Sequence, residues 1–339
     1  MPAAGMPPGR WPFAALTGPC GGSFTPAPDV DAVMTRSRSR AGSIGLLLVL
    51  AVIWGGSVPL TKLGLRDLPP LTLTAMRYLV AAPFFALFLW GRPLPPPRAL
   101  AAAGGLGVLG IAIGQVAQTL GVREISASVA TVISALIPIF VVVFARVRLR
   151  QPIRIREACG LAVAFTGVVL VAGGDPRELI ASGGAMLRGE ALMLLSAVAV
   201  ALYYVLSLSL VAAHSVITVA ALSSLAGAAA LVPVSAWELR HAAARITEVG
   251  VFVVFYLAVL VTVVGLVIWF SSLNRLPASI AAVLQYLQPI VGVAASAALF
   301  GDPLGVPFGI GAGLVALGIA LSTTGQMRDA QELRLPVPK

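Results

Sequence analysis

Residues 126–139 read SASVATVISALIPI, and residues 277–290 read PASIAAVLQYLQPI. The alignment between these stretches, at an offset of 151 residues, continues without a gap from Gly114 to Leu170. Because proline and glycine constrain a helix more than other residues do, their pairing is the stronger part of the match. The paired positions include Gly114/Gly265, Ser128/Ser279, Pro138/Pro289, Pro152/Pro303, Gly160/Gly311 and Gly167/Gly318. This spacing indicates an internal repeat, and the alternative is a chance match between two apolar compositions.

The composition places this repeat in a membrane. Of the 339 residues, 58% are apolar and 11% are charged, and the mean hydropathy is +0.97. A soluble domain carries about 45–50% apolar and about 25% charged residues, so the composition argues against a soluble globular enzyme. Ten apolar runs are long enough to cross a bilayer as helices. They are 43–64, 70–90, 99–120, 126–146, 157–174, 187–210, 214–236, 249–271, 277–300 and 304–324.

Each copy of the repeat holds five of these runs, and an odd number turns the second copy upside down in the membrane. We therefore expect an all-α integral membrane protein of ten transmembrane helices, in two inverted five-helix repeats at 43–174 and 187–325. Residues 1–42, rich in Pro, Gly and Ala, predict a disordered basic tail, and residues 326–339 predict a cytoplasmic C-terminal tail. Inverted repeats are typical of secondary transporters, whose substrate site lies between the two halves and which work by alternating access.

The charge pattern predicts an orientation. The chain has 23 Lys and Arg against 13 Asp and Glu, a net charge of +10. These basic residues are scattered between apolar runs and not gathered on one face, so we expect contacts with membrane lipid and no nucleic-acid partner. With the N-terminus inside, most Lys and Arg fall in cytoplasmic segments, including five arginines in 146–156. We expect a multi-pass protein of the cytoplasmic membrane with both termini in the cytoplasm.

Several motifs resemble those of one transporter family. The stretch Trp54–Lys62, WGGSVPLTK, resembles the first-helix motif of the drug/metabolite transporter (DMT) superfamily, EamA type. Arg77-Tyr78 resembles part of its second helix, and LPAS at 276–279 followed by YLQP at 286–289 resembles its ninth-helix region. The resemblance covers residues 43–325. It implies a ten-helix carrier of two EamA repeats that exports a small metabolite such as an amino acid.

The chain departs from the family's pattern in its acidic residues. Where the family commonly has Glu before the proline of the ninth helix, this chain has Gln288. Where the family commonly has Gly-Glu after the fourth and ninth helices, the chain has Arg150-Gln151 and Gly301-Asp302. No Asp or Glu lies in the middle of an expected span, and a deep carboxylate is the usual proton relay of pumps. We therefore expect a neutral or zwitterionic solute, and a small-multidrug-type proton antiporter is disfavoured.

Polar and aromatic side chains at membrane depth are the candidate substrate ligands. Gln115 and Gln118 share one helix face, and Gln285 and Gln288 repeat that spacing. A polar group at this depth is costly and faces the protein interior or a wet cavity; the alternative is an interhelical hydrogen bond, which contributes about 0.6 kcal/mol. Aromatic rings can stack on a solute, and their alternative is core packing. The candidate set is Trp54, Gln115, Gln118, Ser134, Tyr204, Trp269, Gln285 and Gln288.

Four charged residues and three prolines complete the predicted machinery. Lys62 and Arg77 are expected to hold a substrate carboxylate or to pair with Asp67, and the alternative is snorkelling to the interface. Glu190 and Asp302 are candidates for ion coupling, and the alternative is a solvated helix end. The set Lys62, Arg77, Glu190 and Asp302 is therefore a candidate charged gate. Proline kinks a helix, so the candidate hinges are Pro59, Pro138 and Pro289.

Other classes of function find little support in the sequence. A membrane enzyme acting on lipid-linked substrates needs a catalytic constellation, but the two histidines, His214 and His241, are isolated. We therefore assign no catalytic residues, no metal and no cofactor. A scaffold or regulator without transport activity is the other alternative, and the paired glutamines count against it. The expected partner is a small-molecule substrate, and the oligomeric state, monomer or homodimer, stays open.

Overall fold

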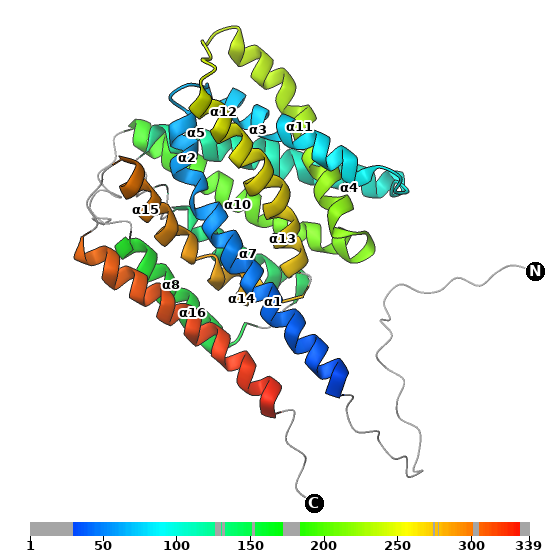
Figure 1. Ribbon diagram of the computed structural model, residues 1–339, viewed down its shortest axis with the longest axis vertical. Helices are drawn as coiled ribbons and strands as arrows, with labels where there is room; N and C mark the ends of the chain where they lie inside the picture. Colours follow the sequence, from blue (N-terminus) through cyan, green and yellow to red (C-terminus); the bar gives the residue numbers. More distant parts are fainter. Residues whose placement is uncertain are drawn as a thin grey trace, which may run out of the picture. The chain divides into compact units, whose positions relative to one another are not determined.

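The structure, a computed structural model, describes residues 30–125, 130, 133–150, 153–171, 184–273, 275–276, 278–300 and 305–332. Every regular element in these residues is a helix (Figure 1), so the all-α class is confirmed. The first half contributes α1 (Val30–Gly55), α2 (Ser57–Gly64), α3 (Pro70–Leu89), α4 (Pro97–Gly107), η1 (Val108–Gln115), α5 (Val116–Glu124), α7 (Leu136–Leu149) and α8 (Ile155–Val171). The second half contributes α10 (Gly184–Ala213), α11 (Val216–Leu239), α12 (Glu248–Phe255), η2 (Tyr256–Val264), α13 (Gly265–Leu273), α14 (Ala278–Leu284), α15 (Leu287–Phe300) and α16 (Val306–Glu332).

Seven helical segments of the described chain are long and apolar enough to cross a membrane. They are Gly42–Gly64, Pro70–Leu89, Pro97–Glu124, Leu187–Ala213, Val216–Leu239, Glu248–Leu273 and Ile280–Leu299, and they coincide with seven of the expected runs. The tenth run corresponds to a shorter apolar helix, Val306–Leu321. The fourth and fifth runs correspond to α7 and α8, of 14 and 17 residues, and both runs extend into residues outside the described ones. The chain is a multi-pass membrane protein, and the count of ten spans stays a prediction.

A buried carboxylate closes the start of α3. The backbone N–H groups of Leu71 and Thr72 donate to the Glu238 carboxylate at 3.2 and 2.7 Å, and Thr72 Oγ1 donates to it at 2.8 Å. The first N–H groups of a helix have no partner within the helix, and its dipole favours a negative charge there. Glu238 is 8% exposed and belongs to the last turn of α11. It therefore ties α11 to α3 without facing water.

The long helices are interrupted at positions that the 151-residue offset relates. The π-helical stretch η1 (Val108–Gln115) maps by this offset onto 259–266, which overlaps η2 (Tyr256–Val264). The helix α7 begins after a turn at Ala135, and α15 begins after a turn at Gln285 and Tyr286. Both helices have 14 residues, and both of their bounds differ by the same 151 residues. Local helix geometry thus follows the repeat seen in the sequence.

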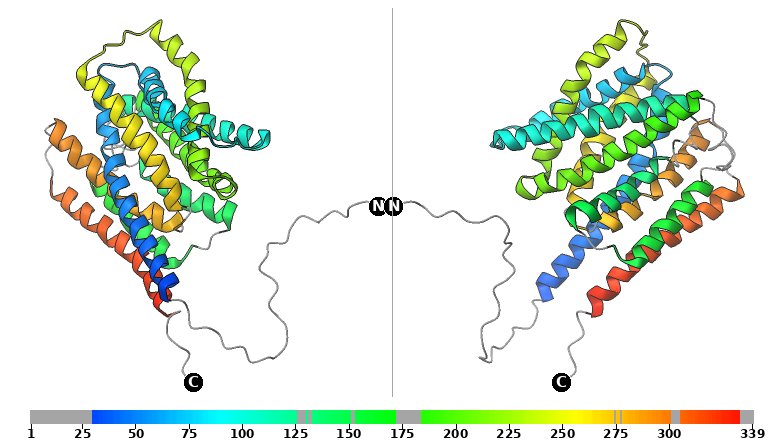
Figure 2. Two further views of the ribbon diagram at one scale, coloured as in Figure 1. Left: turned by 45° about the vertical axis from the view of Figure 1, so that its right-hand side comes forward. Right: turned by 180° about the vertical axis from the view of Figure 1, so that it is seen from behind.

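The helices α8 and α16 pack through glycine. They lie side by side in Figure 1 and in the right-hand view of Figure 2. A Cβ atom on Gly167 would lie 2.6 Å from the Gly311 carbonyl oxygen, and one on Gly318 would lie 2.5 Å from the Gly160 carbonyl oxygen. Small residues let helix backbones approach closely, which is how membrane helices gain packing energy. The 151-residue offset relates Gly167 to Gly318 and Gly160 to Gly311, so the two close approaches are equivalent in the two repeats.

We predict that Gly167→Ala lowers the thermal stability of the protein in detergent, although alanine is the better helix former. The added Cβ meets the backbone of α16, so the helices must move apart, and overpacking of this kind costs about 1–3 kcal/mol. The control is Gly313→Ala on α16, where nothing lies within 4 Å of the new atom. Thermal unfolding followed by size-exclusion chromatography should show a lower Tm for the first variant only. Equal Tm values would contradict this packing.

Candidate functional site

A cavity of about 120 Å³ lies among the helices and holds room for several water molecules. Its walls come from α1, α2, α3, η1, α5, α7, α10, η2, α13 and α15, together with the turns before α7 and α15. All eight candidate substrate ligands border it: Trp54, Gln115, Gln118, Ser134, Tyr204, Trp269, Gln285 and Gln288. Residues far apart in the sequence, and from both copies of the repeat, therefore meet at one place. Whether they bind a substrate stays a prediction.

Aromatic rings form one side of the cavity. Trp54 and Tyr204 stack with their ring centroids 6.1 Å apart and an angle of 6° between their planes. Trp269 lies 5.6 Å from Trp54 and 5.0 Å from Tyr204. All three rings also pack against the hydrophobic core, as the core-packing alternative expects, and stacking on a solute stays a prediction.

The π-helical stretch η2 orients Trp54. The N–H of Gly265 donates to the carbonyl of Leu260, five residues earlier, and not to Val261 as it would in an α-helix. The Val261 carbonyl accepts instead from Trp54 Nε1 at 2.9 Å. Gly265 has no side chain, and a Cβ there would overlap the indole nitrogen. The sequence contained the glycine but no sign of the altered helix that uses it.

The four glutamines differ in their surroundings. Gln288 Nε2 donates to Gln285 Oε1, which leaves the Gln285 amide nitrogen buried and without a partner. Gln115 Oε1 accepts from Arg77 Nη1 at 3.0 Å. This bond joins η1 to α3, so for Gln115 the alternative of an interhelical hydrogen bond is found beside its place at the cavity. Gln285 therefore has an amide nitrogen free to donate to a ligand, and Gln115 fixes the direction of the Arg77 side chain.

Arg77 of α3 borders the cavity and is held in place by neutral groups. Its Nε donates to Thr262 Oγ1 at 2.6 Å, and its guanidinium carbon lies 5.3 Å from the ring centroid of Tyr78. No ion pair joins Arg77 to an Asp or Glu of the described chain. For Arg77 the described chain therefore shows no pair with Asp67, whose carboxylate accepts from Thr247 Oγ1 at 2.5 Å.

Only some of the other predicted charged and hinge residues border the cavity. Lys62 does not border the cavity, and its Nζ donates to the Ile125 carbonyl at 3.3 Å, at the end of α5. Glu190 in α10 and Pro59 in α2 are also not among the residues that border the cavity. Asp302 lies outside the described residues. Pro138 and Pro289, in contrast, border the cavity.

Among the described residues that border the cavity, four have a buried polar atom with no hydrogen-bond partner. These atoms are Ser134 Oγ, Trp269 Nε1, Gln285 Nε2 and Tyr286 Oη. Buried polar groups are satisfied in nearly all native structures, and an unsatisfied one costs about 1–3 kcal/mol. Such a concentration around one cavity is typical of a site that a ligand or water completes.

Two contributors to this region were not singled out from the sequence. Thr262 holds Arg77, and Tyr78 lies under its guanidinium. Thr262 is fully buried, and its position inside an apolar run was the one signal by which the sequence could have identified it. Tyr78 stood next to Arg77 in the quoted motif, but sequence proximity says nothing about which ring faces a cation.

Relatives of the chain are transporters by name. An uncharacterized transporter of Archaeoglobus fulgidus is 29% identical over 81% of this chain and 96% of its own length. The uncharacterized inner membrane transporter YedA of Escherichia coli is 30% identical over 41% of this chain and 46% of its own. A probable amino-acid metabolite efflux pump of Salmonella typhimurium is 30% identical over 42% of this chain and 47% of its own.

A solved crystal structure has the same fold. It superimposes with a TM-score of 0.70, covers 84% of this chain and 98% of its own, and is 17% identical in sequence. The profile of the EamA-like transporter family matches residues 42–173 and again residues 187–324. Together these two matches cover most of the chain, and they agree with the motifs found at Trp54–Lys62 and 276–289. The chain belongs to the EamA-like transporter family.

Proposed function

We propose that this transporter is a secondary carrier that exports a small organic metabolite, such as an amino acid, across the cytoplasmic membrane by alternating access. The observation that carries the proposal is the cavity, where polar and aromatic residues of both repeats meet inside an otherwise apolar bundle. The efflux name of the Salmonella typhimurium relative supports export. Names within the family indicate transporters and not enzymes.

The proposed architecture is ten transmembrane helices in two inverted five-helix EamA repeats. Three features support it: the equal bounds of α7 and α15 at the 151-residue offset, the overlap of η1 and η2, and the glycine contacts of α8 with α16. The offset of 151 residues turns the contact of Gly167 with Gly311 into the contact of Gly318 with Gly160. A two-fold axis between the repeats requires such paired contacts. Such a relation places the shared site between the halves.

The proposed movement uses the helix interruptions before Pro138 and Pro289. Proline has no N–H, so the carbonyl four residues earlier loses its helical partner and the helix bends there with little loss of bonding. Both prolines border the cavity, one from each repeat. If one repeat bends while the other straightens, the cavity opens to one side of the membrane, and the reverse exchange opens it to the other.

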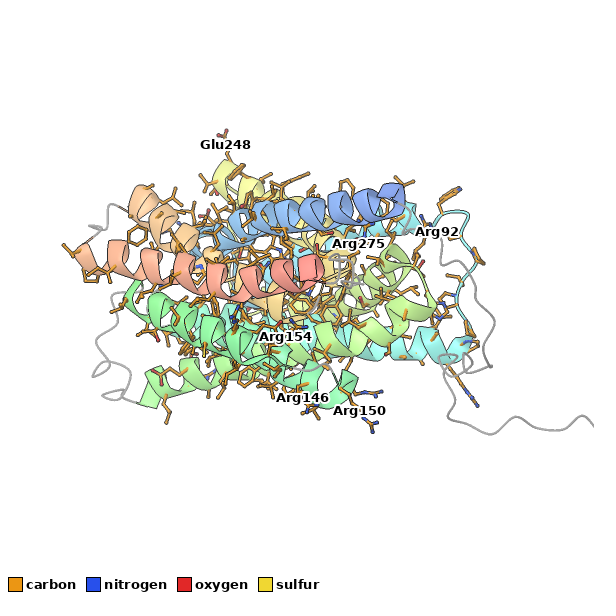
Figure 3. All side chains as sticks on the ribbon, turned by 90° about the horizontal axis from the view of Figure 1, so that it is seen from below. Arg92, Arg146, Arg150, Arg154, Glu248 and Arg275 are labelled. Carbon is orange, nitrogen blue, oxygen red and sulfur yellow. The ribbon has the colours of Figure 1, made fainter. Side chains whose placement is uncertain are left out.

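We predict that Arg92 and Glu248 face opposite sides of the membrane. Arg92 follows α3, Glu248 begins α12, and the labelled arginines lie to one side of Glu248 in Figure 3. In a Cys20→Ser/Cys159→Ser background, Arg92→Cys should react with an impermeant maleimide only in inverted vesicles. Glu248→Cys should react in intact cells, as both termini in the cytoplasm require. Labelling of both from one side would refute this topology.

We predict that the double variant Gln115→Ala/Gln288→Ala loses substrate counterflow. Proteoliposomes are loaded with pooled amino acids and offered one labelled member outside. Wild type should accumulate label, and the variant should do so at least about tenfold more slowly, because one substitution releases Arg77 and the other releases Gln285.

The matched control is Thr166→Ala, whose exposed hydroxyl bonds only within α8. This variant should accumulate label like wild type. Equal rates for wild type and the double variant would keep the carrier and remove these amides from the substrate path. No accumulation from any solute pool, with folded protein, would contradict the transport proposal and favour a scaffold.

A further inference from the structure

Several groups that border the cavity can donate a hydrogen bond that no described residue accepts. Arg77 and Trp269 can only donate, and Tyr286, Ser134 and the Gln285 amide nitrogen each have a donor. Four of these five groups are buried without a partner, as described above, and the fifth is a cation. Neither Asp nor Glu is among the described residues that border the cavity. The described wall therefore offers a cationic group no carboxylate, and it offers an anion one guanidinium and several free donors.

Arg77 is oriented for a ligand before any ligand arrives. Thr262 accepts from its Nε and Gln115 accepts from its Nη1. Both partners are neutral, so no residue of the described chain compensates the positive charge. A guanidinium presents donors in a planar fork that matches a carboxylate, and two of its nitrogens are already fixed in direction. A charge at membrane depth is costly without a counter-charge, and such residues mark substrate pathways. The missing counter-charge is a property that a substrate can supply.

The charge and the aromatic wall of the cavity narrow the choice of anion. Arg77 is the one Lys or Arg among the described residues that border the cavity, so it balances one negative charge and not the two of a phosphate monoester. The stacked pair of Trp54 and Tyr204, with Trp269 beside it, offers an aromatic surface for the remainder of the molecule. One cation, several donors and an aromatic wall describe a site for a small aromatic monocarboxylate.

We propose that Arg77 is the anion-binding residue of the cavity, and that the solute is recognised by its carboxylate together with an aromatic or apolar body. The inference rests on the proposed function, because it takes this cavity as the transport site. No described carboxylate borders the cavity to receive an α-ammonium group, so an amino acid binds no more tightly than the corresponding acid without the amino group. This deepens the expectation of a zwitterionic solute by assigning the recognition to one end of it.

The test is equilibrium binding of three matched ligands to the full-length protein in lipid nanodiscs, measured by calorimetry. The ligands are 3-phenylpropionate, its neutral amide 3-phenylpropionamide, and phenylalanine. We expect the acid to bind at least about tenfold more tightly than the amide and at least as tightly as phenylalanine. Arg77→Gln should abolish the preference for the acid. Arg77→Lys, which keeps the charge but loses the fork, should preserve the preference with weaker binding.

The control is Arg92→Gln, an arginine of the surface whose Nη1 bonds to Ser215 Oγ, and it should bind like wild type. Arg77→Gln removes two hydrogen bonds, so the Tm and elution volume of this variant are measured too. If Arg77→Gln does not fold, the comparison of Arg77→Lys with wild type is the test. Equal binding of acid and amide, retention of the preference without Arg77, or no binding of the acid by folded wild type would each overturn the proposal. Phenylalanine binding tenfold more tightly than the acid would overturn the claim about the ammonium group.

The binding measurement separates this proposal from the transport proposal. It uses no gradient and no vesicle, so a protein that binds the acid and shows no counterflow contradicts transport and leaves the anion site standing. A protein that transports other solutes and does not bind the acid supports transport and contradicts the anion site.

Discussion

Hydrogen bonding of the backbone in lipid is the constraint on which the structure depends. A bilayer core offers no partner to an N–H or C=O group, so irregular backbone survives there only where protein or a wet cavity replaces the lipid. The interruptions of the described helices follow this rule. The residues on either side of the turn at Gly56, the stretches η1 and η2, the turn at Ala135 and the turn at Gln285-Tyr286 all contribute to the cavity wall. The site is where the helices depart from regularity.

The same departures determine which chemical groups the cavity presents. The shifted bonding in η2 frees the Val261 carbonyl, which fixes Trp54, and Thr262 in the same stretch fixes Arg77. One element thus positions both the aromatic surface and the cation. The carboxylates of the neighbouring helices are used elsewhere: Glu238 caps α3 and Asp67 binds Thr247. Neither of these two carboxylates borders the cavity, where Arg77 is the charged group of the described lining.

Much of the site could be predicted from the sequence, because polar residues inside apolar runs are costly and must converge. The eight residues chosen by depth and residue type all border the cavity. Charged residues near helix ends were harder to assign, since an interfacial charge has many ways to be satisfied. Lys62 bonds to the end of α5 and Glu190 is not among the residues that border the cavity, whereas Arg77 borders it. Glu238 escaped notice because its role depends on α3, which is more than 160 residues away in the chain.

The sequence by itself determined the membrane class, the helical architecture and the repeat, because composition, run length and the spacing of proline and glycine act locally. The tertiary structure alone decided which side chains meet and which groups stay unpaired. Packing of the helices pairs Arg77 with Thr262 and Gln115. The same packing leaves Trp269 Nε1 and Tyr286 Oη without a hydrogen-bond partner in the described chain. Hydrogen bonds between distant helices depend on rotation and register, and no local pattern encodes either.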